Sequence, residues 1–283
     1  MFDSKYIEQE LRNINKHLDK QIKIYIFGGG AMSFYDLKTA TKDIDVLLTS
    51  ETEASALIKT LYKTGYNKIG TKDSVYIKMK NREMIENIDG FRWDVFVNKV
   101  CGGLSFSEDM QKRSKPFKKF SNIKAYLISP EDIFIFKSVT SRPRDREDMF
   151  TLFSHGLNVD IIKKEIQKQA KLDEDKAWLS YFFVGLDELV SEYNIIFPDY
   201  DEFLRLAEEE ILEKLIIEFI QKKPRSLNDL VSILKYGRDE IRQILEELTQ
   251  RNKILSKLLD IDDMKLKQHL ALLHKLRKDK QTD

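Results

Sequence analysis

Apolar and polar positions follow two different spacings along the chain, and the change between them comes near residue 128. In the first part, apolar residues recur at helical spacing over 5–20 and 51–63, and a short helix fits 31–37. Short apolar runs bounded by glycines or charges predict strands at 22–27, 44–48, 75–79, 91–97 and 123–128. We therefore expect an α+β arrangement in which helices accompany a small mixed sheet of about five strands.

Beyond residue 128 almost every segment has helical spacing. Ser129 followed by Pro130 and two carboxylates is a typical helix start, with serine as the cap and proline at the first helical position. Helices are expected at 130–139, 144–154, 159–170, 173–193, 199–222, 227–234, 238–251 and 262–278, with a strand-like run at 253–255. The pattern predicts three domains, at 1–128, 129–208 and 209–283.

Composition narrows the class of protein. Cys101 is the only cysteine, which excludes an internal disulfide and a cysteine-rich zinc site. The first twenty residues lack the apolar core of a signal peptide, and no apolar run approaches the roughly 18 residues that a membrane helix needs. We therefore expect a cytoplasmic protein.

Two aspartates interrupt the second predicted strand. Asp43 and Asp45 project to one face of a strand, whereas Ile44 and Val46 project to the other. Neighbouring carboxylates repel each other, and burying them unpaired is costly. A divalent cation removes both problems, because Mg²⁺ binds one or two carboxylates and takes its other oxygens from water and phosphates. The pattern predicts a site for Mg²⁺ or Mn²⁺; a plain exposed strand end is the alternative.

The glycines before this strand suit a phosphate group. Gly28, Gly29 and Gly30 let the backbone approach a ligand closely, and the amides of the following short helix point toward an anion. A third carboxylate, Asp94, shares a strand face with Arg92, and it could complete a two-metal site or deprotonate an attacking hydroxyl. A glycine turn beside clustered carboxylates is typical of phosphoryl or nucleotidyl transfer. A glycine triplet alone is more often a simple turn.

These motifs carry a family resemblance. The stretch GGGA at 28–31, followed by TKDID at 41–45, resembles the signature of the DNA polymerase β-type nucleotidyltransferases, and more narrowly their minimal, abortive-infection-toxin-like branch. A second block, from Ser129 to Lys137 and then RPRDRED at 142–148, is similar to the helix lysine and arginine–aspartate stretch of that branch. The resemblance covers roughly residues 22–155.

The resemblance implies a role for each matching residue. Asp43 and Asp45 would be metal ligands, Asp94 the third acid, and Gly28 and Gly29 the phosphate loop. The sequence departs from the family pattern at two positions: Gly30 stands where a serine or threonine hydroxyl commonly touches the phosphate, and Thr39 where an arginine is frequent. The resemblance also implies that residues 1–128 are the catalytic domain and that an NTP, such as ATP, is a substrate.

Charged residues of the second block have two interpretations each. Lys137 lies on an otherwise apolar helix, from which it could reach a triphosphate or extend to solvent. Asp145 and Asp148 share a helix face near several arginines, and they suit either a site or a structural ion-pair network. The resemblance favours nucleotide binding for Lys137 and Asp145, whereas Asp148 suits the structural role.

A basic segment lies between the two motif blocks. Residues 111–130 contain six basic side chains and no acidic one, in a chain whose net charge is only +1. Attraction to a nucleic-acid backbone is one interpretation, with Lys115, Lys118 and Lys119 as contacts, and a solvated loop is the other.

The C-terminal helices resemble a winged helix-turn-helix. In such domains the third helix, here 238–251, often enters the major groove, and Arg238 and Arg242 would be its exposed contacts. Residues 211–257 hold ten basic and seven acidic side chains, a modest excess for DNA binding. Nucleic-acid binding and protein contact or self-association both remain open.

Three functions fit these features. The first is Mg²⁺-dependent transfer of a nucleoside monophosphate from an NTP to an acceptor hydroxyl, at an RNA 3′ end such as that of tRNA or on a protein side chain. The second is a catalytically weak or inactive nucleotidyltransferase fold that works as a winged-helix DNA-binding or assembly module. The third is a toxin that an antitoxin partner neutralises.

Overall fold

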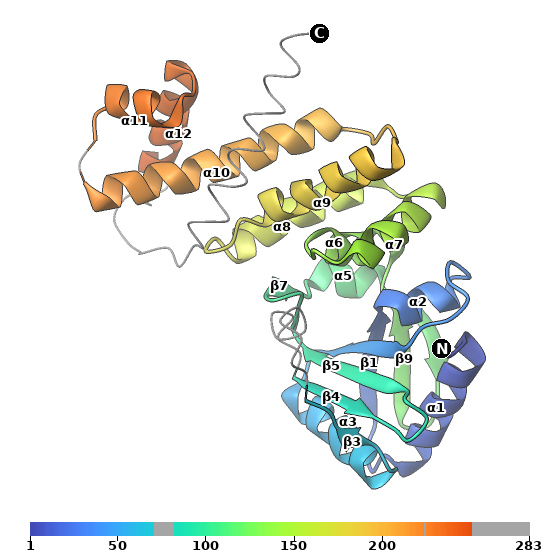
Figure 1. The fold of residues 1–283 in the computed structure, drawn as a ribbon. Coiled ribbons are helices and arrows are strands. Elements are labelled where there is room, and N and C mark those ends of the chain that lie inside the picture. Colours follow the sequence, from blue (N-terminus) through green and yellow to red (C-terminus); the bar gives the residue numbers. More distant parts are fainter. Residues whose placement is uncertain (71–81, 224, 251–283) are drawn as a thin grey trace. The chain divides into compact units, whose positions relative to one another are not determined.

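The computed structural model describes residues 1–70, 82–223 and 225–250 and divides the chain into two compact units, Met1–Glu165 and Ile166–Asp283 (Figure 1). The strand predicted at 75–79, the strand-like run at 253–255 and the helix at 262–278 lie outside the described residues. The division into three domains stays a prediction.

The first unit is built on a seven-stranded sheet in the order β3-β4-β5-β2-β1-β9-β8, and β6 and β7 form a separate pair (Figure 1). The described strands are β1 (Ile22–Phe27), β2 (Asp43–Leu48), β3 (Asn67–Lys68), β4 (Glu83–Glu86), β5 (Arg92–Val97), β6 (Lys99–Val100), β7 (Leu104–Ser105), β8 (Lys115–Lys119) and β9 (Ile123–Leu127). The mixed sheet and its apolar strands were predicted, whereas β3, β4 and β8 were not. These three strands are short or highly charged, and β3 and β8 are the sheet edges, where polar residues discourage further pairing.

Strand β2 lies at the centre of the sheet, between β1 and β5. It runs antiparallel to β1 and parallel to β5. In this register Asp43 stands opposite Arg92, and Asp45 stands opposite both Asp94 and Phe27. Residues opposite each other in a ladder project to the same face, so strand pairing alone brings the three aspartates of the two motifs together.

The first unit contains the helices α1 (Ser4–His17), α2 (Gly28–Phe34), α3 (Glu51–Lys63), α5 (Glu108–Arg113), α6 (Pro130–Ser138) and α7 (Pro143–Ser154), and α8 (Val159–Leu172) crosses the boundary between the units. Helix α3 packs on β1, β2 and β5 and also contacts α1. The predicted helix start holds: the Ser129 hydroxyl accepts a hydrogen bond from the Asp132 amide at 3.2 Å, and Pro130 begins α6.

One local prediction was wrong, and one of two interpretations is excluded. Helix α2 was expected to begin at Ala31 after a glycine turn, but it begins at Gly28 and ends at Phe34. Gly28 has φ +60°, which turns the chain from β1 directly into the helix, so no separate turn is needed. The basic segment at 111–130 is not a loop, because it contains the end of α5, β8, β9 and the first residue of α6.

The described part of the second unit is helical. It contains α9 (Trp178–Tyr193), α10 (Tyr200–Lys222), α11 (Leu227–Leu234) and α12 (Arg238–Gln250). Helices α9 and α10 pack together through rings such as Phe182 and Phe203, whose centroids are 5.0 Å apart, and α11 and α12 both contact α10. Ser226 and Asp229 form the capping box that starts α11. A winged helix is not confirmed, because its expected strand falls outside the described residues.

The same described residues contain no helix that combines the length and the apolar character needed to cross a membrane.

Candidate functional site

The site begins with the three aspartates on one face of the central sheet. Asp94 is only 1% exposed, and Asp43 and Asp45 are half-buried. Arg92 lies among them: its Nε is 2.8 Å from Asp94 Oδ1, and its terminal nitrogen Nη2 donates a hydrogen bond to Asp43 Oδ2. Among the described residues, by contrast, the Asp45 carboxylate has no ion-pair or hydrogen-bond partner. Arg92 therefore forms ion pairs with two of the three carboxylates.

Two of the three glycines press against this carboxylate face. A Cβ atom at Gly28 would lie 2.2 Å from Asp45 Oδ2, so no side chain fits there. A Cβ atom at Gly29 would lie 2.8 Å from Oγ1 of Thr41, whose hydroxyl donates to Asp43 Oδ1 at 3.3 Å. The start of α2 is thus in close contact with the aspartate strand, as a shared site requires.

Gly30 has different surroundings from the other two glycines. A Cβ atom there would make ordinary 3.5 Å contacts with Ile26 and Ile44. A serine or threonine at position 30 would therefore direct its side chain toward apolar core residues, away from the carboxylates. The departure from the family pattern at Gly30 removes no hydroxyl that would face Asp45 in this fold.

The carboxylates carry more negative charge than their surroundings balance. Burial, and then the negative charges of Asp43 and Asp94, raise the pKa of Asp45 well above its usual value. Burial also raises the pKa of Asp94 to about 7, although the Arg92 guanidinium opposes this shift. Arg142 and Lys137 are close enough to Asp45 for their positive charges to lower its pKa in part. The site would be stabilised by an additional cation.

Lys137 is at the centre of a buried ion-pair cluster beside these carboxylates. It is 6% exposed, and its Nζ lies 3.0 Å from Asp145 Oδ1 and 2.6 Å from Asp148 Oδ2. Burial lowers the pKa of Lys137, but the two aspartates outweigh this effect and the net shift is upward, so the side chain remains charged. Lys137 therefore does not extend to solvent. Lys38 completes the cluster at 2.7 Å from Asp148 Oδ1.

Asp145 is held in the same cluster from a second side. Arg142 Nε donates to its Oδ2 at 2.8 Å, and the Thr140 hydroxyl donates to the same oxygen. Although burial raises the pKa of Asp145, the positive charges of Lys137 and Arg142 prevail and lower it to about 2. Both aspartates of the second motif block are thus members of an ion-pair network. Through Arg142 and Lys137 the network reaches the electrostatic surroundings of Asp45.

The donor set matches a divalent cation in its chemistry. Mg²⁺ is usually held by one or two carboxylates together with water and substrate phosphates, and Asp43 and Asp45 supply such oxygens next to the start of α2. Within the described ranges no group of three or more His, Cys, Asp or Glu side chains is spaced to hold a metal ion, and Arg92 pairs with Asp43 and Asp94. The residues fit an ion that shares its coordination with a substrate, and they do not form a closed protein site.

The basic residues predicted to contact nucleic acid lie in two places. Lys115 and Lys119 are exposed on the edge strand β8, and Lys118 lies 3.3 Å from Glu8. The centroid of the Phe117 ring in this strand is 4.2 Å from that of Phe34, the last residue of α2. The basic strand is therefore packed against the helix that begins at Gly28.

Arg238 and Arg242 belong to the second unit. Both are exposed on α12; Arg238 donates a hydrogen bond to Asn228, and Arg242 lies 3.5 Å from Asp239.

Three basic residues near the site had no assigned role from the sequence: Arg92, Arg142 and Lys38. The alternation of Arg92 and Asp94 on one strand was a usable signal, because side chains two apart share a face. Lys38 had no such signal, since its partner Asp148 lies 110 residues further along the chain. Arg142 lies three residues before Asp145, a spacing that brings two side chains together on a helix.

Residues 5–187 match the model of a family described as nucleotidyltransferase of unknown function, DUF6036. Among curated proteins no match was found. A crystal structure of ANT(2″)-Ia in complex with adenylyl-2″-tobramycin is similar at 12% identity and a TM-score of 0.41, over 59% of this chain and 97% of that one. JHP933 from Helicobacter pylori is similar at 14% identity and a TM-score of 0.34, over 89% and 98% of the respective chains. TM-scores this low assign neither a fold nor a function to this chain.

Proposed function

Because the chain belongs to the DUF6036 family of nucleotidyltransferases of unknown function, we propose that it transfers a nucleoside monophosphate from an NTP such as ATP to an acceptor hydroxyl, releasing pyrophosphate. The observation that carries the proposal is the close approach of Gly28 to Asp45, with Asp43 and Asp94 on the same sheet face. A triphosphate with a bound metal ion needs backbone that it can approach closely and carboxylates that bind the ion. The glycines and the neighbouring aspartates meet these two needs.

In this proposal Asp43, Asp45 and Asp94 would hold Mg²⁺ or Mn²⁺. The ion, when bound, neutralises charge on the triphosphate and on the attacking oxygen. The backbone of Gly28, Gly29 and Gly30 would bind the phosphates, and Arg92 would fix the position of Asp94.

Lys137 and Asp145 would support nucleotide binding from α6 and α7. The positive charge of Lys137 is retained by Asp145 and Asp148, so it adds to the attraction for phosphate near Asp45. Asp145 keeps Arg142 in the same region, because the two side chains form an ion pair. The cluster would therefore act by placing two cations near the phosphates.

The acceptor that we favour is an RNA 3′ end, for example that of tRNA. The basic strand β8 supports this choice, because Lys115 and Lys119 are exposed on an element packed against α2. Modification of RNA ends would give the protein the character of a toxin, and an antitoxin or a second copy of the chain would then be a partner. A protein side chain is the alternative acceptor.

The experiment incubates the full chain with each α-labelled NTP, Mg²⁺ or Mn²⁺, and total RNA. We expect metal-dependent label in the RNA, and its loss in the double variant Asp43→Asn plus Asp45→Asn. The matched control is Asp19→Asn, whose side chain is 84% exposed and lies outside the site. Absence of label from RNA, protein and small acceptors with every NTP would refute the enzymatic proposal.

A second candidate is a binding protein that has kept the fold without turnover. The observation in its favour is that Arg92 pairs with two of the three aspartates, so a metal ion would have to share these carboxylates with the arginine. This candidate predicts no metal-dependent NTP binding, but a salt-sensitive DNA mobility shift that weakens in Arg238→Gln plus Arg242→Gln. Calorimetry with a nonhydrolysable NTP, with and without Mn²⁺, separates the two candidates.

A further inference from the structure

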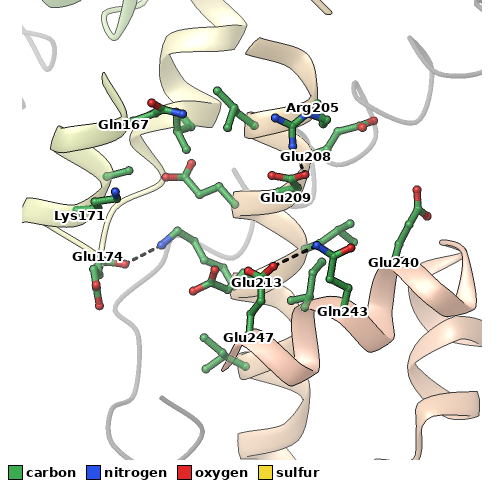
Figure 2. Close-up of a pocket in the computed structure, with 18 of the residues that line it drawn as sticks. Gln167, Lys171, Glu174, Arg205, Glu208, Glu209, Glu213, Glu240, Gln243 and Glu247 are labelled. Atoms are coloured by element: carbon green, nitrogen blue, oxygen red, sulfur yellow. Dashed lines mark hydrogen bonds and ion pairs between the residues drawn. The ribbon is translucent and has the colours of Figure 1, made fainter. Parts of the chain in front are cut away.

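The second unit contains a pocket of about 660 Å³ that the aspartate site does not include (Figure 2). Its lining comes from α8 and the segment that follows it, from the start of α9, from α10 and α12, and from Tyr236 just before α12. Figure 2 shows the labelled polar side chains around the pocket, on several of these elements. A volume of this size lies within the range of small-molecule sites.

The lining is strongly acidic although the whole chain is nearly neutral. Eight lining residues are acidic and three are basic, a formal excess of five negative charges, whereas the chain carries +1. The acidic lining residues are Glu174, Asp175, Glu208, Glu209, Glu210, Glu213, Glu240 and Glu247. Such an arrangement repels anions and attracts cations, so nucleotides and nucleic acid are unsuitable occupants.

Glu210 provides a second and independent indication of a ligand. Its Oε2 accepts a hydrogen bond from the Ser180 amide at 2.9 Å, but Oε1 is buried and has no hydrogen-bond partner within the described part of the chain. The nearby Lys214 is itself buried and donates its hydrogen bond to the Glu174 carbonyl oxygen at 2.6 Å. A buried carboxylate oxygen without a partner is costly, and a donor group in the pocket would relieve that cost.

Apolar residues lie between the acidic ones. Leu179, Leu206, Leu212, Ile217 and Ile244 also line the pocket, so carboxylates alternate with surface that suits methylene groups. A single metal ion would bind carboxylates but would leave the apolar part of this lining without a partner. An occupant with separated positive charges on an apolar chain matches both parts.

We propose that this pocket binds a small organic cation with two or more ammonium groups joined by alkyl segments, as in a linear polyamine. An ammonium group donates hydrogen bonds to Glu210 Oε1 and to the other carboxylates, and the alkyl segments contact the leucine and isoleucine side chains. The proposal concerns binding alone, so its outcome does not depend on nucleotidyl transfer.

The test is isothermal titration calorimetry of the full chain with spermidine at constant ionic strength. We expect saturable binding to the wild type and at least tenfold weaker binding to the triple variant Glu209→Gln, Glu213→Gln and Glu247→Gln. A matched triple variant carries the same change at Glu192, Glu218 and Glu246, which lie on α9, α10 and α12 outside the pocket. It should bind within twofold of the wild type.

Two further measurements locate the binding. The variant Asp43→Asn plus Asp45→Asn should keep wild-type affinity, which excludes the aspartate site as the source of the heat. Octane-1,8-diol, which is similar in length but uncharged, should not bind. Thermal melting confirms that each variant is folded, and Glu210→Gln serves as a second pocket variant in which the side chain keeps its shape.

Three results would overturn the proposal. These are the absence of saturable binding to the wild type, equal losses in the two triple variants, and loss of binding in the Asp43 and Asp45 double variant. The second would mean attraction by diffuse surface charge, and the third would move the binding to the sheet face.

Discussion

The protein gathers acidic side chains in two regions, and the two are built in opposite ways. In the first unit three aspartates come from two neighbouring strands, and Arg92, Lys137 and Arg142 lie close enough to offset part of their charge. In the second unit eight acidic residues come from α10, from α12 and from the turn between α8 and α9, and three basic residues accompany them. The first cluster is compact and partly compensated, whereas the second is spread out and left with an excess of negative charge.

The difference follows from the geometry of the two scaffolds. Paired strands hold opposite residues about 5 Å apart, so carboxylates in register share one small ligand such as a metal ion. Helices pack with their axes roughly 8–10 Å apart, so acidic residues on different helices face a wider space. The first arrangement suits a phosphate-bound ion, and the second suits an elongated organic cation.

The largest effect on activity is expected from a substitution in the aspartate cluster of the first unit. Asp45→Asn should lower nucleotidyl transfer by a factor of about 10³ or more, since a ligand of the ion is lost. Thermal stability should stay the same or rise, because burial and two like charges already disfavour the charged form of Asp45. Labelled-NTP incorporation and thermal melting measure the two quantities. A variant that retains activity would remove Asp45 from the site.

The next largest effect is expected when the positive charge that offsets the buried aspartates is removed. Lys137→Met leaves Asp145 and Asp148 buried with less positive charge, and we expect a loss of about 3–4 kcal/mol in the free energy of unfolding. Urea denaturation measures it. Adding Asp148→Asn to the same chain should recover part of the loss, because one of the two carboxylates that lost Lys137 as a partner is then neutral. If the double variant is no more stable than the single one, the pair is not coupled.

Gly28 and Gly30 form a matched pair that tests the contact between helix and strand. Gly28→Ala should lower the free energy of unfolding by about 2–3 kcal/mol and also reduce activity, because its Cβ would lie 2.2 Å from Asp45 Oδ2 at φ +60°. Gly30→Ala makes ordinary contacts at 3.5 Å, so a change below about 1 kcal/mol is expected. Equal effects of the two substitutions on denaturation would contradict the close approach at Gly28.

The smallest effect concerns pH and the second region. Burial raises the pKa of Glu210 to about 7 in the folded chain, whereas its usual value is 4.5. Between these values the unfolded chain loses the proton and the folded chain keeps it, so the free energy of unfolding falls as pH rises. We expect a fall of about 2 kcal/mol between pH 5 and 7 from this group.

Glu210→Gln should flatten this part of the pH profile, and it should make the protein more stable than the wild type at pH 8. Glu192→Gln, an exposed change on α9, should leave the profile as it is. Chemical denaturation at several pH values measures all three chains. Parallel profiles for wild type and Glu210→Gln would show that this carboxyl group is not perturbed by burial.

Much of the first unit could be predicted from the residues. The strand at 44–48 and the helix at 51–63 reappear as β2 and α3 within one residue, because periodicity and caps act over a few positions. The charged strand β8 was missed, since KPFKK has no alternation of apolar and polar residues and pairs only at the sheet edge.

The sequence by itself determined which residues could share a strand face and where most helices begin, and so it named Asp43, Asp45 and the glycines. Only the tertiary structure decided that β2 pairs with β5 in the register that sets Asp45 beside Asp94 and lets Arg92 bridge Asp43 and Asp94. It also decided that Lys137 meets Asp145 and Asp148, and that glutamates of separate helices surround one hollow. The spacing of apolar and polar residues within a few positions determines a helix or a strand. Strand register and helix packing are set instead by the burial of side chains that are distant in the chain.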